Sequence, residues 1–333
     1  MKAMRIHAWG EAPRLDELPE PVPQPGRSLV RMAATTASHL DRSIAAGGFL
    51  RHPALPYIPG VEAAGTVLQS ERFAVGARVW LRGGGLGTSE DGTWRETISA
   101  PDAAIGALPE TIPMPLGAAF FSPCTAAWVA LFGVGAVQRG ERVLISGATG
   151  AVGSIALQLA RAAGARVAVV VSAAVDAVDD AFGDDIERVA IDERPLSGAL
   201  DDGDTQPSFD LLVDTVGGAG LMRLVRRILP GGRAVLVGYT AGRRVELDLT
   251  ELMQRDVRLL PLNMLRREAE ARAAAPGLLA RLADGRLTLA LRTFALAQAA
   301  DAMAWIGERG HRGRAVLVAD LASAVVSENA AGS

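Results

Sequence analysis

The spacing of apolar and polar positions divides the chain into two parts. Up to about residue 110, short apolar runs such as 28–34, 65–68 and 77–81 are separated by closely spaced Pro and Gly. This spacing predicts short strands in a barrel-like β domain. From Glu141 onward, apolar runs alternate with longer segments of helical pattern. Strands that alternate with helices predict a doubly wound parallel sheet, so the fold class is α/β.

The predicted strands of the second part are 142–146, 166–172, 187–192, 209–215, 233–238 and 257–262. The first of them is an apolar run typical of strands buried on both faces of a parallel sheet, and the third is the weaker pattern. Helices are expected over 152–163, over 221–229 and after about residue 264. A closing apolar run, 313–318, predicts a strand that returns to the first domain. The small polar residues of 323–333 predict a disordered tail.

One uncharged stretch, 111–138, is long enough to raise the question of a membrane span. It contains Pro113, Pro115 and Pro123 and several glycines. We interpret it as a helix and its approach, buried in a soluble core. The N-terminal residues lack an apolar signal region, so we expect a cytoplasmic protein without a membrane partner.

Composition excludes several classes of protein. Asp and Glu number 37 against 34 Lys and Arg, for a formal charge of −3, and this balance argues against a nucleic-acid partner. Cys124 is the only cysteine, so an intrachain disulfide framework is impossible. A structural zinc site of four cysteines, or of three cysteines and a histidine, is also impossible. A small-molecule substrate is the expected partner.

A glycine-rich turn follows the first strand of the α/β part. The turn contains three glycines, Gly147, Gly150 and Gly153, with Ala148, Ala151 and Val152 between them in the sequence, and a predicted helix follows. Gly150 and Gly153 have the spacing of the last two glycines of the dinucleotide fingerprint, and Ala148 stands where its first glycine usually falls. Such a turn brings backbone N–H groups and a helix N-terminus close to a pyrophosphate. We therefore expect these six residues to bind a dinucleotide.

The end of the second strand indicates which dinucleotide. An acidic residue there commonly holds the ribose hydroxyls of NAD, but this strand ends at Ser172 and the first carboxylate is Asp176. The pattern favours NADPH over NADH. Ser172 can donate to a 2′-phosphate, and Arg194 is a candidate cation. Ligands bind at the carboxyl ends of such strands, so the turns holding Val216 and Gly238, Tyr239 and Thr240 are further candidates.

Six motifs in order resemble the medium-chain dehydrogenase/reductase superfamily, in its zinc-free quinone-oxidoreductase-like branch. They are Leu55–Val67 (LPYIPGVEAAGTV), Asp91–Thr97 (DGTWRET), Gly147–Gly153 (GATGAVG), Phe209–Gly218 (FDLLVDTVGG), Leu229–Arg233 (LPGGR) and Gly310–Leu317 (GHRGRAVL). The resemblance implies a Rossmann domain, 123–263, inserted in a GroES-like β-barrel catalytic domain, 1–122 with 264–333. It also implies an active-site cleft at their junction, NADPH as hydride donor and a homodimer formed through the Rossmann sheets.

The resemblance also bears on zinc. Zinc-dependent relatives have a Cys followed three residues later by Asp, and here Ser38 stands in place of that Cys, with Asp41 after it. The His of their Gly-His-Glu is Val61 in this chain. Two ligands are thus replaced, and Cys124 alone does not hold a catalytic zinc. We therefore expect a metal-free enzyme.

Without a metal, reduction of an electrophilic conjugated system is easier than alcohol oxidation, because the developing enolate needs only hydrogen-bond donors and a proton. The resemblance places Ser38, His39 and Asp41 near the nicotinamide as candidate catalytic residues. By the same resemblance Thr125 and Arg314 are candidate cofactor contacts. Three residues are candidates for the substrate pocket, namely Ser43, Phe49 and Asn263.

Three functions follow as alternatives. The first is an NADPH-dependent reductase of quinones or α,β-unsaturated carbonyls. The second is an enoyl reductase of the acryloyl-CoA type, to which the 66–76 connection and the glycine-rich loop 83–87 are similar. The third is an NADPH-binding sensor or structural protein without turnover, because Ser38 and Ser43 weaken the polar set.

Overall fold

The computed structural model describes residues 1–48, 53–172, 182, 185–191, 206–308 and 310–319. Its contacts divide the chain into two compact units, which we describe one at a time. Unit 1 is Met1–Phe121 with Leu289–Ser333, and unit 2 is Ser122–Thr288. Of the residues discussed above, Phe49, Asp176, Arg194 and the tail 323–333 lie outside the described residues.

Unit 2 ends at Thr288, later than the domain boundary at 263/264 that the sequence predicts. Helix α7 (Glu268–Ala283) packs against η2 (Val129–Val134), a π-helical turn of unit 2. Its buried face, which includes Leu278 and Leu279, therefore belongs to the core of unit 2. The assignment of catalytic and cofactor roles to the two units stays a prediction.

A seven-stranded sheet forms the centre of unit 1, with the order β14-β15-β3-β4-β5-β7 and with β6 paired to β3. A separate hairpin pairs β1 with β2. The strands are β1 (Lys2–Arg5), β2 (Arg14–Glu17), β3 (Arg27–Ala37), β4 (Glu62–Gln69), β5 (Arg78–Arg82), β6 (Thr97–Pro101), β7 (Ile105–Ala107), β14 (Leu291–Ala295) and β15 (Arg314–Val318). Its helices are α1 (His39–Ala45), α2 (Met114–Ala119) and α8 (Ala299–Gly307). The predicted short strands of the β domain are therefore confirmed.

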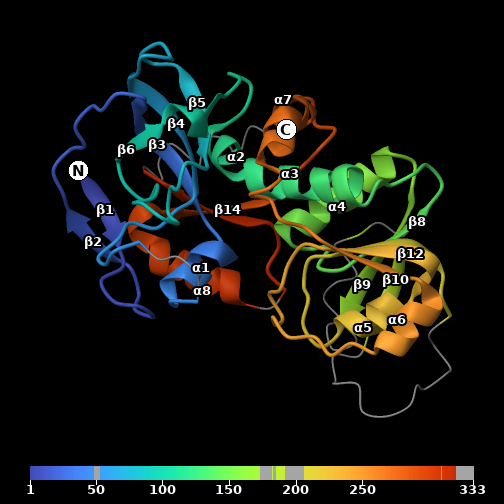
Figure 1. The fold of residues 1–333 in the computed structure, drawn as a ribbon. Coiled ribbons are helices and arrows are strands. Elements are labelled where there is room, and N and C mark those ends of the chain that lie inside the picture. The colour runs from blue at the N-terminus through green and yellow to red at the C-terminus, as the bar shows by residue number, and fades with distance from the viewer. Residues whose placement is uncertain (49–52, 173–181, 183–184, 192–205, 309, 320–333) are drawn as a thin grey trace. The chain divides into compact units, whose positions relative to one another are not determined.

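The closing strand returns to the first part of the chain, as the sequence predicts. β15 pairs antiparallel with β3 and parallel with β14, and all five of its residues are buried. Figure 1 shows α8 and β14, coloured orange to red, among the blue and cyan elements of this unit. Trp94 belongs to the core around this sheet, and its indole N–H donates to the Thr36 carbonyl at 2.9 Å.

Unit 2 contains a six-stranded, wholly parallel sheet in the order β10-β9-β8-β11-β12-β13. This is the doubly wound topology predicted from the alternating pattern, with its switch point between β8 and β11. The strands are β8 (Arg142–Ile145), β9 (Arg166–Ser172), β10 (Glu187–Ile191), β11 (Phe209–Asp214), β12 (Ile228–Leu236) and β13 (Arg258–Pro261). The helices, besides α7, are α3 (Phe121–Trp128), α4 (Ala151–Ala162), α5 (Leu221–Arg226) and α6 (Leu249–Arg255).

The uncharged stretch 111–138 is divided among α2, α3 and η2, and none of them is long. In the part of the chain that the structure describes, no helix has the length and apolar character needed to cross a membrane. Pro113 precedes α2 as its N-cap. Buried side chains such as Phe120, Cys124 and Leu131 bring this stretch into the protein core.

Candidate functional site

The glycine turn between β8 and α4 has the conformation expected of a phosphate-binding loop. Gly147 has a φ of +64°, and Gly150 is the N-cap of α4 in an extended conformation. A Cβ on Gly153 would lie 2.2 Å from the Gly147 carbonyl oxygen, whereas one on Gly150 would meet only that oxygen, at 3.3 Å. Gly153 is therefore needed for close packing of the helix on the turn, and Gly150 leaves space beside the helix N-terminus. A dinucleotide pyrophosphate fits this arrangement.

Three turns meet at the carboxyl edge of the unit 2 sheet. The Thr215 hydroxyl, after β11, donates to the Ser146 carbonyl at 2.8 Å, after β8. The Ala241 N–H, after β12, donates to the Val216 carbonyl at 3.0 Å. Gly238 packs so closely that a Cβ there would lie 2.1 Å from the Thr215 carbonyl oxygen. The structure thus brings the predicted residues Gly147, Val216 and Gly238 to one edge.

A buried carboxylate that is not among the residues predicted from the sequence holds two of these turns together. Asp214, 1% exposed, accepts a short hydrogen bond from the Ser146 hydroxyl. It also accepts the N–H groups of Val216 at 3.3 Å and Gly217 at 2.9 Å. Burial raises the pKa of Asp214, and these three donors oppose the increase. A charged residue that ends the apolar run FDLLVD was the available signal.

The other predicted cofactor and substrate residues of unit 2 are placed as follows. Tyr239 is 51% exposed and Thr240 is also exposed, directly after β12. Asn263 follows β13, and its side-chain oxygen accepts the N–H groups of Leu265 and Arg266, at 3.0 and 3.3 Å. Thr125 is fully buried in α3. Ser172 is the last residue of β9.

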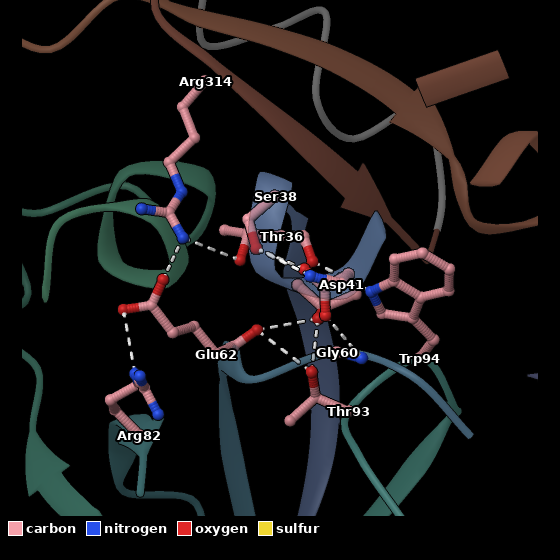
Figure 2. Close-up of polar contacts among 10 residues, drawn as sticks. Thr36, Ser38, Asp41, Gly60, Glu62, Arg82, Thr93, Trp94 and Arg314 are labelled. Carbon is pink, nitrogen blue, oxygen red and sulfur yellow. Dashed lines mark hydrogen bonds and ion pairs between the residues drawn. The ribbon is translucent and has the colours of Figure 1, made fainter. Parts of the chain in front are cut away.

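In unit 1, Ser38 and Asp41 form a pair at the start of α1 (Figure 2). Ser38 caps the helix, and its hydroxyl donates to the Asp41 carboxylate at 2.5 Å. The second carboxylate oxygen accepts the Gly60 N–H at 3.1 Å. Asp41 is 1% exposed, whereas Ser38 is partly exposed. Burial raises the pKa of Asp41 to about 6, although Ser38, Arg314 and the Gly60 amide favour its charged form.

A buried ion pair lies on the neighbouring strands. Arg314 on β15 donates to the carboxylate of Glu62 on β4, and to the Thr36 hydroxyl at 3.2 Å. Arg82 lies 3.8 Å from the other Glu62 oxygen (Figure 2). The side chains of Glu62 and Arg314 are 1% and 9% exposed. Arg314 was predicted to contact the cofactor; within unit 1 it contacts Glu62 and Thr36, and the cofactor contact stays a prediction.

His39 is the first residue of α1 and is exposed. Partial burial lowers its pKa to about 4, and the positive charges of His311 and Arg42 add to this effect. The two imidazole rings lie 5.9 Å apart between centroids. At neutral pH His39 is therefore uncharged, so it can offer a hydrogen bond but has no readily released proton. Ser43 is partly exposed on the same helix.

Tyr57 is buried at 1% exposure, and among the described residues its hydroxyl has no hydrogen-bond partner. Burial and the negative charge of Asp41 raise its pKa. The ring packs beside Ile6, Ile44 and Ala45. We expect Tyr57→Phe to leave the free energy of unfolding unchanged or to raise it by about 1 kcal/mol, because an unpaired buried hydroxyl is costly. Urea unfolding measures this, and a loss above about 1 kcal/mol contradicts it.

The residues that correspond to zinc ligands do not fit that metal. Val61 has no donor atom, and the Ser38 hydroxyl is bonded to Asp41. Cys124 is buried and is not part of a disulfide. In the described ranges no group of three or more His, Cys, Asp or Glu side chains could hold a metal ion. We derive no chemistry through zinc, and the metal-free character of the protein stays a prediction.

Two family models match this chain. The model described as an alcohol dehydrogenase GroES-like domain matches residues 24–110, within unit 1. The model described as a zinc-binding dehydrogenase matches residues 187–317. The two matches agree with the expectation of a GroES-like domain joined to a Rossmann domain.

Individual relatives support the same family. The chain is 28% identical to mouse quinone oxidoreductase over 79% of its own length and 80% of the relative's. It is 33% identical to human quinone oxidoreductase, over 50% of the chain and 51% of the relative. A solved structure of quinone oxidoreductase from Thermus thermophilus, described with its NADPH complex, aligns with a TM-score of 0.75. It is 28% identical and covers 96% of this chain and 100% of that one.

The quinone oxidoreductase relatives support an oxidoreductase that uses a nicotinamide cofactor, and the dinucleotide turn of unit 2 agrees with such a cofactor. The chain belongs to the medium-chain dehydrogenase/reductase superfamily and is similar to its quinone oxidoreductases. The resemblance found in the sequence motifs is therefore confirmed at the level of the family and of the fold.

Proposed function

We propose that this protein is an NADPH-dependent reductase that transfers hydride to a quinone or an α,β-unsaturated carbonyl compound. The observation that carries the proposal is the phosphate-binding turn of unit 2. Gly150 leaves space at the N-terminus of α4, and the turns after β8, β11 and β12 meet beside it. The mouse, human and Thermus relatives are quinone oxidoreductases, and this similarity supports the substrate class.

The residues of the turn have defined tasks in this proposal. The first N–H groups of α4 are free of helical partners and point toward a bound pyrophosphate. Asp214 fixes Ser146 and the backbone of Val216 and Gly217, so the cofactor meets a rigid edge. The dinucleotide, when bound, supplies the hydride. Ser172 and Arg194 stay candidates for the 2′-phosphate. Because the single cysteine offers no disulfide, we also propose a cytoplasmic location.

An assay of NADPH oxidation with naphthoquinone, cyclohexenone and a short enoyl-CoA tests the proposal and separates the alternatives. We expect turnover of the first two, with NADPH preferred over NADH. Turnover confined to the enoyl-CoA would favour the acryloyl-CoA type of reductase. Saturable NADPH binding without any turnover would leave the non-catalytic interpretation. Stoichiometric zinc in the purified protein would contradict the metal-free proposal.

We further propose that the protein is a homodimer formed through unit 2. β13 is the outermost strand of its sheet, and such an edge presents free backbone groups. Leu249 and Met253 lie one turn apart on α6 and are 67% and 79% exposed, and Leu265 after β13 is 78% exposed. A second copy of the chain would cover these apolar side chains.

Light scattering is expected to give twice the chain mass of 34.7 kDa for the wild type. Met253→Glu places a charge in the proposed interface and is expected to shift the protein toward the monomer. Val75→Glu, at a residue of unit 1 that is 75% exposed, is the matched control and is expected to stay dimeric. A monomeric wild type would contradict the proposal.

A further inference from the structure

Reduction of an enone requires a proton as well as a hydride, and the predicted catalytic residues of unit 1 offer two candidate sources, His39 and the pair formed by Ser38 and Asp41. His39 carries no proton to release near neutral pH, because its pKa lies at about 4. The remaining candidate is the pair formed by Ser38 and Asp41. Their 2.5 Å hydrogen bond joins a buried carboxyl group to the hydroxyl of a residue that is partly exposed.

The direction of this hydrogen bond depends on the protonation of Asp41. An ionised carboxylate only accepts, so the Ser38 proton is directed toward it. A protonated Asp41 becomes the donor to the Ser38 oxygen, and the Ser38 proton is then free to point elsewhere. The Gly60 N–H fixes the other carboxylate oxygen, so the carboxyl group does not rotate away.

We propose that Asp41 and Ser38 form a proton relay that delivers the proton in the reduction of an unsaturated carbonyl compound. The inference rests on the proposed function. The β-carbon of the substrate receives the hydride and its electron pair, and the C=C bond becomes an enolate. The O–H bond of Ser38 breaks and its proton passes to the enolate, while the O–H bond of Asp41 breaks and its proton replaces the one lost from Ser38. Asp41 is left as a carboxylate, which takes up a proton from the buffered solvent before the next turnover.

The groups around Asp41 determine when it carries a proton. Arg314 from β15 and the Gly60 amide from the segment before β4 favour the carboxylate, whereas burial opposes it. The negative charge of Asp41 contributes to the raised pKa of the Tyr57 hydroxyl. On α1, the helix that carries Asp41, the other ionisable side chains are His39 and Arg42. A pKa of about 6 leaves about a tenth of the Asp41 side chains protonated at pH 7. Relay activity is therefore expected to decrease as pH rises through about 6.

The test uses two hydride acceptors that differ in their need for a proton. Cyclohexenone gives an enolate that must be protonated, whereas nitrocyclohexene gives a nitronate anion that persists in water. We expect Ser38→Ala to reduce kcat on cyclohexenone by about 100-fold, the contribution typical of general acid catalysis. Its rate on nitrocyclohexene should be within about threefold of the wild type. Ser38→Thr, which keeps a hydroxyl and a helix cap, should restore most of the activity on cyclohexenone.

The pH profile of kcat provides a second readout, because a purely structural role of Asp41 would leave that profile unchanged. On cyclohexenone, the decrease of kcat through about pH 6 should be present in the wild type and absent in Asp41→Asn. An equal loss on both acceptors in Ser38→Ala, or an unchanged pH profile in Asp41→Asn, overturns the relay and leaves the proposed function intact. A wild type that binds NADPH but reduces neither acceptor, nor naphthoquinone, contradicts the proposed function itself.

Discussion

Gly150→Ala is expected to weaken NADPH binding by about 10- to 100-fold, or roughly 1.4 to 2.8 kcal/mol. A methyl group at this position would occupy the space at the N-terminus of α4 where a pyrophosphate approaches the backbone. The fold itself should tolerate the change. Gly150 has a φ of −74°, and the added Cβ would meet only the Gly147 carbonyl oxygen, at 3.3 Å. Quenching of tryptophan fluorescence on titration with NADPH measures the affinity, and thermal unfolding without cofactor measures the stability.

Substitutions at two other glycines distinguish a loss of NADPH affinity from a loss of stability. Gly153→Ala should lower the melting temperature without cofactor, because its Cβ would lie 2.2 Å from the Gly147 carbonyl oxygen. Gly277→Ala, inside α7 with nothing within 4 Å, should stabilise the protein by about 0.5 to 1 kcal/mol and leave NADPH affinity unchanged. If Gly150→Ala binds NADPH as tightly as the wild type, the turn does not hold the pyrophosphate.

Arg314→Met is expected to lower the free energy of unfolding by about 3 to 5 kcal/mol. The substitution removes the guanidinium from a Glu62 carboxylate that is 1% exposed and has Arg82 at 3.8 Å. A buried charge that loses its partner is strongly unfavourable, because desolvation is no longer offset. Urea unfolding followed by circular dichroism measures the loss. A decrease below about 1 kcal/mol would mean that Arg82 or water replaces the lost guanidinium.

A double variant tests the cause of that loss. Replacing Glu62 and Arg314 together by methionine removes both charges, so much of the stability is expected to return. Met32→Ala is a matched control in the same core, where a cavity rather than a charge lowers stability, by about 2 to 5 kcal/mol. A double variant as unstable as Arg314→Met alone would show that packing, not charge, explains the effect.

The sequence was sufficient for the parts of the fold that depend on local pattern. The strands of the unit 2 sheet were predicted because apolar runs with turn residues at both ends leave few alternatives. The beginning of β12 was placed too late. The sequence predicts a helix over 221–229 and a strand from 233, but the strand begins at Ile228 and includes Pro230 and the two glycines after it. The register between β11 and β12 shifts here, between Phe209 and Leu211, which accommodates the irregular residues.

Contacts between distant positions could not be predicted in this way. Glu62 and Arg314 are 252 positions apart, and no local periodicity connects them. The sequence offered Ser38 and Asp41 as separate candidates, because nothing in the chain shows that the hydroxyl donates to the carboxylate or that Gly60 supplies the second contact. The C-terminal boundary of unit 2 depends on the packing of α7 against η2, which is a tertiary contact and not a local pattern.

The return of β15 to the sheet of unit 1 has a consequence for synthesis on the ribosome. Unit 2 is one continuous segment, so its sheet can form as soon as Thr288 has emerged. Unit 1 must wait, because β3 pairs with β15, which is made after the whole of unit 2. Until then the edge of β3 that pairs with β15 is open, and an open edge favours association with other nascent chains. Chaperone demand for this protein should therefore come from its N-terminal half.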